Sequence, residues 1–198
     1  MLKLTAVLLF LIFAGLTITT RFAGRPRETD TQSGVAFEER NMDMEPKLVM
    51  RDETRLIGIQ VRTTNQQETD PAKAKIGTLW GRFYQEQIAD KIPNKKSGDV
   101  VLAAYTKYES DANGPYTLVV GREVNSLASV PNGMTGVAIP AGKYLAFSAH
   151  GPVPKTIIDT WTYIWKYFAS AAKYQRAYTT DYEVHSSPDQ TDIYIAVK

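Results

Sequence analysis

The side chains in this sequence with the clearest chemical potential are aromatic, and they recur at a fixed spacing. Two sets of four apolar residues fall at relative positions 0, 3, 4 and 7: Ile76, Leu79, Trp80 and Phe83, and Trp161, Ile164, Trp165 and Phe168. This spacing places each set on one face of a helix. Indole and phenol rings attract organic cations to their faces. Two such helices packed on one sheet would leave a groove lined by tryptophan and tyrosine.

The elements around the first helix begin with a strand. Alternation of Ile57, Ile59 and Val61 predicts a half-buried strand within residues 47–63. We expect the helix to begin at Asp70-Pro71 and to run to about Asp90. Asp can accept hydrogen bonds from the free amides of a first turn, and Pro lacks an N–H that would be unpaired there.

The remaining elements repeat this order, which predicts a duplication. The Asn113-Gly114 pair is a hairpin signal between two strands of the first half. The expected elements after the first helix are strands at 100–108 and 116–124, then strands at 134–139 and 143–149, a helix at 154–171, and strands at 177–185 and 192–198. The order predicts an α+β fold of duplicated β-α-β-β units, with an antiparallel sheet, two long helices packed on it and a central groove.

Composition bounds the function classes. The chain has 198 residues, of which 43% are hydrophobic and 11% aromatic, so it can bury a real core. A net charge of +2, with no basic stripe and no helix-turn-helix or zinc-finger spacing, predicts no direct nucleic-acid binding. Without cysteine the chain has no disulfide, thiolate nucleophile or cysteine metal site. No nucleophile elbow, phosphate loop or metal-spaced cluster is present either, so we predict no metal and no cofactor.

The amino terminus bears on localisation. Lys3 precedes an apolar run over residues 4–18, which Arg21 and its neighbours end. A signal peptide and a membrane anchor both fit this pattern, although about 15 to 17 residues is short for crossing a bilayer. We therefore expect residues 1–24 to be a signal peptide or anchor, with export or membrane attachment through residues 1–20. A cytoplasmic location is the alternative if this segment is not a targeting signal. Residues 25–45 are polar and fit a flexible linker, so the folded domain should span 46–198.

Several runs within residues 46–198 resemble those of a known family. They are 71–84 (PAKAKIGTLWGRFY), 105–111 (YTKYESD), 114–121 (GPYTLVVG), 139–144 (IPAGKY) and 178–184 (YTTDYEV). They resemble the gyrase-inhibitor-like effector-binding domains, which include the ligand domains of AraC-type and MerR-type multidrug regulators. The closest resemblance is to stand-alone members found in integron gene cassettes. The resemblance implies a pseudo-twofold fold whose central groove binds bulky, apolar and often cationic organic molecules. The export-like amino terminus departs from the usual cytoplasmic members.

The resemblance also selects an acid. The family has a glutamate at the base of the groove on its next-to-last strand, and Glu183 matches that position. Such a carboxylate would compensate a bound cation for its lost water. Glu109 and Glu123 are weaker candidates, and a solvated strand carboxylate is the plain alternative. An aromatic stripe can also be ordinary core. The predicted ligand-binding residues are Trp80, Phe83, Tyr84, Tyr105, Tyr108, Tyr116, Trp161, Trp165, Tyr182 and Glu183.

The sequence thus favours a binding protein that sequesters or senses hydrophobic, mainly cationic small molecules without a DNA-binding domain of its own. Two alternatives stay open. Some relatives hydrolyse strained cyclopropyl natural products, and Glu183 with Tyr105 or Tyr108 could activate water in that way. A structural or protein-interaction module would need no pocket. A related fold binds haem, but His150 and His185, the two histidines, are isolated and more typical of structural or surface groups.

Overall fold

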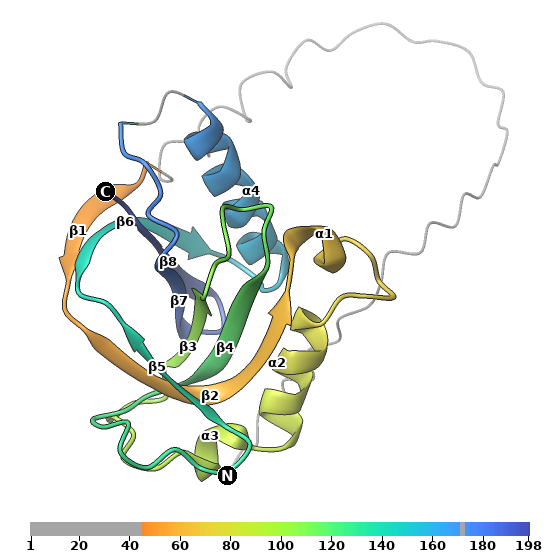
Figure 1. Cartoon of the computed structure of the whole chain (residues 1–198), viewed down its shortest axis with the longest axis vertical. Coiled ribbons are helices and arrows are strands. Elements are labelled where there is room, and N and C mark those ends of the chain that lie inside the picture. The colour runs from red at the N-terminus through yellow and green to blue at the C-terminus, as the bar shows by residue number, and fades with distance from the viewer. Residues whose placement is uncertain (1–44, 171–172) are drawn as a thin grey trace, which may run out of the picture. The chain divides into compact units, whose positions relative to one another are not determined.

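An antiparallel sheet of eight strands organises this computed structural model, which describes residues 45–170 and 173–198 (Figure 1). The predicted targeting segment, residues 1–24, and residues 25–44 of the predicted linker lie outside the described residues. The strands follow one another in space as β1-β6-β8-β7-β3-β4-β2-β5. Their bounds are β1 Lys47–Arg51, β2 Thr54–Thr63, β3 Val101–Thr106, β4 Tyr116–Glu123, β5 Thr135–Ile139, β6 Gly142–His150, β7 Thr180–Ser187 and β8 Gln190–Ala196.

The two halves of the chain are related by a pseudo-twofold axis between β3 and β7. One half supplies β1, β2, the helix α2 (Ile76–Gln85), β3 and β4, and the other supplies β5, β6, the helix α4 (Lys155–Ala169), β7 and β8. Exchanging the halves leaves the strand order unchanged. The predicted α+β class and duplication are confirmed, with one more strand in each unit. That extra strand pairs in the other half, because β1 pairs with β6 and β5 pairs with β2.

Short connections force the sheet to curl. Residues 52–53 alone join β1 to β2, and residues 140–141 alone join β5 to β6. In each case the joined strands are six places apart in the sheet. Six strand spacings in a flat sheet would be about 29 Å, whereas a two-residue connection spans only about 10 Å. The two edges must therefore approach each other, and Figure 1 shows the curled sheet with α2 and α4 outside the curl.

A pair of glycines permits the closest strand contact. Gly58 of β2 lies opposite Gly121 of β4. A Cβ atom on Gly58 would lie 2.0 Å from the carbonyl oxygen of Val120, and one on Gly121 would lie 2.0 Å from that of Ile57. No side chain fits between the two strands here, so glycine is required at both positions.

Each face of the sheet carries its own core. Leu79 and Phe83 of α2 pack over β2, β3 and β4, together with Ile88 of the short helix α3 (Ile88–Lys91). Trp161 and Ile164 of α4 pack over β6 and β8. No helix of the described part of the chain contributes to the core on the other face, which draws on all eight strands: Val49, Leu56, Leu102, Ala104, Val119, Val137, Ile139, Tyr144, Tyr182, Val184, Tyr194 and Ala196.

The first long helix begins later than the sequence predicted. Residues 70–75 do not join it, because the Asp70 carboxylate accepts the Ala72 N–H at 3.0 Å and forms a separate turn. Glu68, at the end of the short helix α1 (Asn65–Glu68), caps α2 instead. Its carboxylate accepts the N–H groups of Lys75 and Ile76, each at 3.1 Å. Two of the unpaired N–H groups at the start of α2 are thus satisfied from outside the helix.

The other boundary corrections have local causes. The helix expected to reach residue 90 is broken at Gln87, whose φ of 50° is left-handed, and α3 is a separate turn. The single run 47–63 divides into β1 and β2 at residues 52–53. No helix within residues 45–170 and 173–198 is long and apolar enough to cross a membrane.

Candidate ligand-binding site

Glu183 lies at the centre of the sheet with its side chain buried. It sits on β7 opposite Ala103 of β3 and Ile193 of β8. Those two neighbours belong to the cores under α2 and α4, so Glu183 points to the helix-bearing face. Only 2% of its surface is exposed. A buried carboxylate needs hydrogen-bond partners, because burying an unpaired charge is very costly.

Three side chains satisfy this carboxylate. Its Oε1 atom accepts hydrogen bonds from the Tyr105 hydroxyl and from the Trp161 indole N–H, both at 2.7 Å. Its Oε2 atom lies 2.8 Å from Nε2 of His185. Donors from β3, from α4 and from β7 itself therefore converge on one group.

The surroundings keep Glu183 charged. Burial by itself raises the pKa of Glu183, but the hydrogen bond and charge of His185, with the hydrogen bonds from Trp161 and Tyr105, bring that pKa below its ordinary value. The pKa of Tyr105 is raised well above its ordinary value, first by burial and then by the adjacent Glu183 charge. Tyr105 thus stays a protonated donor, and Glu183 stays ionised.

Aromatic rings from both helices surround this charge. The Trp80 ring of α2 lies 4.9 Å from the His185 ring, centroid to centroid. On the α4 side the Trp161 ring is 5.0 Å from Tyr105, and Tyr116 of β4 is 5.7 Å from the same Tyr105 ring. The structure therefore brings together five of the residues that the sequence predicted to line a site between the helices: Trp80, Tyr105, Tyr116, Trp161 and Glu183.

Two predicted residues form the outer edge of this group. Tyr84 is exposed and stacks on Trp80, with ring centroids 5.9 Å apart. Trp165 lies one turn beyond Trp161 on α4 and is exposed, with the two ring centroids 6.3 Å apart. Phe83 is buried in the core under α2 and meets the edge of Trp80 at 6.2 Å. The aromatic rings of α2 and of α4 therefore extend from the core to the surface of the protein.

A second buried carboxylate lies nearby on the same strand. Asp181 accepts hydrogen bonds from the Tyr108 hydroxyl and the Ala196 N–H, both at 2.8 Å, and pairs with Arg176. The Arg176 guanidinium lies 4.5 Å from the centroid of the Tyr178 ring. Asp181 thus has a permanent internal cation, whereas the partners of Glu183 are two neutral donors and a histidine.

The structure does not bring Tyr182 together with the other predicted residues. Consecutive residues of a strand point to opposite faces, so Tyr182 turns away from Glu183. It stacks on Tyr194 at 4.7 Å and accepts a hydrogen bond from Arg51 at 3.0 Å. The weaker acidic candidates also lie elsewhere, because Glu109 pairs with Arg62 and Glu123 with Lys96 on the surface.

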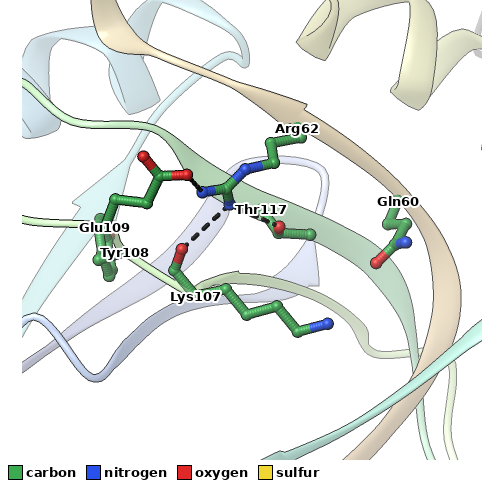
Figure 2. Close-up of a pocket in the computed structure, with 6 residues that line it drawn as sticks. All are labelled: Gln60, Arg62, Lys107, Tyr108, Glu109 and Thr117. Atoms are coloured by element: carbon green, nitrogen blue, oxygen red, sulfur yellow. Dashed lines mark hydrogen bonds and ion pairs between the residues drawn. The ribbon is translucent and has the colours of Figure 1, made fainter.

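A pocket of about 500 Å³ opens at the ends of β2 and β4 (Figure 2). Each residue that lines it carries a polar group on its side chain: Gln60, Arg62, Lys107, Tyr108, Glu109 and Thr117. Arg62 donates to the Lys107 carbonyl at 3.1 Å and to the Thr117 hydroxyl at 3.2 Å, and it also pairs with Glu109. The Glu109 carboxylate of this pocket is thus already neutralised at the surface. Tyr108 is the one aromatic residue in the pocket lining, so we place the candidate site at Glu183.

His185 is the member of this group that the sequence analysis did not predict. Its position two residues after Glu183 on a strand was the available signal, because residues i and i+2 share a face. The contact with Trp80 depends on how α2 packs and had no sequence signal. His150 lies at the exposed end of β6.

Comparisons with known proteins agree with this fold. Residues 47–197 match the family described as integron-associated effector binding protein, Cass2. The chain belongs to this family. An integron cassette protein from the mobile metagenome of Vibrio cholerae is 35% identical to this family member, with a TM-score of 0.68. The match covers 77% of this chain and 95% of that chain.

Two further relatives extend the comparison. YobU of Bacillus subtilis, which carries the name of a transcriptional regulator protein, is 27% identical over 154 residues, 74% of this chain and 94% of that protein. The solved structure of SAV2435 bound to tetraphenylphosphonium is 20% identical, with a TM-score of 0.64 over 78% of this effector-binding protein and 94% of that chain. At that identity the likeness establishes the shared fold.

Proposed function

We propose that this effector-binding protein binds hydrophobic organic cations at Glu183, between α2 and α4, and so sequesters or senses them. One observation carries the proposal. Glu183 is a buried, charged carboxylate among aromatic rings, and none of its partners is a permanent cation. Asp181, two residues away, already has Arg176. Of these two buried acids, Glu183 is therefore the one that can accept a cation from outside.

The rings supply the rest of the binding energy. Trp80 and Trp161 come from opposite helices, and Tyr105 and Tyr116 come from the strands between them. A cation placed over a ring face in a site without water gains about 2 kcal/mol for each such contact. The bound tetraphenylphosphonium of SAV2435, a bulky aromatic cation, supports the same class of ligand for this fold.

A pair of matched ligands tests the role of charge. We expect tetraphenylphosphonium to quench tryptophan fluorescence saturably and to raise the melting temperature of the 198-residue chain. Glu183→Gln should weaken tetraphenylphosphonium binding by about tenfold or more, which is about 1.4 kcal/mol, and change that of neutral triphenylphosphine oxide by less than about twofold. Gln keeps the size of the side chain and can still accept a hydrogen bond.

Glu109→Gln is the matched control, because the Glu109 carboxylate is exposed and already paired with Arg62. It should leave both affinities unchanged. Equal losses for the cation and the neutral compound in Glu183→Gln would remove the charge from the proposal. No response to either compound would favour the protein-interaction alternative. The hydrolase alternative stays a prediction, and the lowered pKa of Glu183 makes this carboxylate a weak general base.

A further inference from the structure

We infer that His185 is an internal counter-ion which competes with cationic ligands for Glu183, so that the affinity of the site for cations rises with pH. The inference rests on the proposed function and names a specificity-determining residue for it. Three observations carry it: which oxygen His185 occupies, what lies on its other side, and how its second nitrogen is bonded.

His185 is the replaceable partner of the carboxylate. Oε1 of Glu183 accepts hydrogen bonds from Tyr105 and Trp161, and both of these side chains are held in the packing of β3 and α4. Within the described residues, His185 is the one hydrogen-bond partner of Oε2. The His185 side chain is 15% exposed, against 2% for Glu183, so it is the partner through which Oε2 can be reached. A cation that approaches Oε2 must displace the imidazole or share the oxygen with it.

The imidazole already occupies the place that suits a cation. It lies between the Glu183 carboxylate, at 2.8 Å, and the Trp80 ring, at 4.9 Å between centroids. When protonated, the imidazole is itself a small aromatic cation between an acid and an indole. A ligand cation would seek the same two interactions. His185 and the ligand are therefore alternatives for one position.

The second nitrogen allows His185 to change charge without leaving a polar atom unpaired. Ionised Glu183 can only accept, so Nε2 carries a proton in either charge state. Nδ1 lies 3.1 Å from the hydroxyl of Thr191, which is buried on β8. In neutral His185 Nδ1 accepts from that hydroxyl, and in charged His185 it donates to the same oxygen. A hydroxyl can take both roles because it is both donor and acceptor.

The charges around His185 are few. Glu183 of β7 is the ionised group in contact with it among the described residues. Around it, β8 presents Thr191, α2 presents Trp80, and β3 places Val101 opposite. Tyr105 and Tyr116 lie beyond Glu183 and stay neutral, because burial raises the pKa of each. The state of His185 thus decides whether the net charge of this pair is zero or negative.

The sign of the effect follows by linkage. Protonated His185 neutralises Glu183, whereas neutral His185 leaves an uncompensated carboxylate that favours a cation. Cation binding should release up to one proton, so the Kd of a permanent cation should fall by up to about tenfold for each pH unit as the pH rises. Histidine side chains titrate between about pH 5 and pH 8. Above that range the Kd should become constant, and a neutral ligand should show no such change.

The test compares tetraphenylphosphonium and triphenylphosphine oxide on the 198-residue chain from about pH 5.5 to about pH 8.5. Tetraphenylphosphonium does not titrate, so the protein supplies any pH dependence. His185→Gln removes the titration and keeps groups that can bond both Glu183 and Thr191. His150→Gln is the matched control, because the second histidine is exposed at the end of β6. Calorimetry of the wild type in two buffers of different ionisation enthalpy counts the released protons without any variant.

Support requires that the Kd of tetraphenylphosphonium falls steeply with rising pH in the wild type and in His150→Gln but stays constant in His185→Gln. Binding to the wild type should also release a fraction of a proton near pH 6, and this release should vanish at high pH. Binding that is equally pH-independent in wild type and His185→Gln, without proton release, overturns the inference and leaves the proposed function standing. Absence of saturable tetraphenylphosphonium binding at every pH overturns the proposed function and the inference together.

Discussion

At the scale of residues, Glu183 links the stability of the fold to pH. The pKa of Glu183 lies below its ordinary value of 4.5 in the folded protein. Its contribution is therefore fully present above about pH 4.5 and is lost as the pH falls through the folded pKa. We expect Glu183→Gln to unfold more easily than wild type at neutral pH by about 2 kcal/mol, since three hydrogen bonds to a charged group are weakened. Thermal unfolding between about pH 7 and pH 3 should show this difference shrinking.

Glu109→Gln is again the control and should match wild type at every pH, because its carboxylate is exposed. A gap between wild type and Glu183→Gln that is as wide in acid as at neutrality would contradict the linkage. The same residues show what sequence could predict here. Helical spacing predicts the helix faces that carry Trp80 and Trp161 without tertiary information. Tyr182 was predicted as one of the strand tyrosines that line the site, but it faces away from Glu183 because strand neighbours point to opposite faces.

At the scale of elements, α4 separates buried from exposed positions of the same residue type. Ile164 is 0% exposed and Ile158 is 55% exposed. We expect Ile164→Ala to cost about 2 to 5 kcal/mol through lost burial and the cavity left behind. Ile158→Ala should stay within about 0.5 kcal/mol of wild type. Denaturant unfolding of both variants checks this, and equal costs would mean that α4 does not pack on the sheet as described.

Element boundaries mark where local sequence ceases to be sufficient. The apolar spacing of Leu79 and Phe83 predicted the existence and face of α2, because those depend on periodicity alone. The first residue of α2 depends on Glu68 of the preceding helix α1, whose carboxylate caps Ile76. Asp70, the residue that resembled a cap, forms its own turn. A signal that is correct for a turn was thus read as a signal for a helix.

At the scale of the whole molecule, the close pairing of β2 and β4 at Gly58 and Gly121 controls whether the curled sheet can form. We expect Gly58→Ala to destabilise the fold by about 3 kcal/mol or more or to prevent folding, because a methyl group would overlap backbone atoms of Val120 and Gly121. Gly81→Ala is the control, since open space surrounds that position on α2. It should stabilise the protein by about 0.5 to 1 kcal/mol. Thermal unfolding compares the stability of the two variants. A Gly58→Ala variant as stable as wild type would refute the close approach of β2 and β4 at this position.

The global arrangement was the least accessible from sequence. Short connections such as residues 140–141 have the local signature of a turn between neighbouring strands. In the structure the strands on either side of that turn pair elsewhere, β5 with β2 and β6 with β1 and β8. Which strands meet is decided by the curl of the entire sheet, and no single window of sequence contains that information.

The first strand of each half, β1 or β5, pairs with a strand of the other half, and this has a consequence for the ancestry of the chain. A primordial gene that encoded one half would have produced a peptide whose first strand could not pair within its own subunit. Two copies would satisfy each other by donating that strand reciprocally, in a closed homodimer with a true twofold axis. Gene fusion would then join subunits that were already interlocked. Later divergence of the two copies would account for the asymmetry of the central strands, because β7 carries Glu183 and His185 whereas its counterpart β3 has neither residue type.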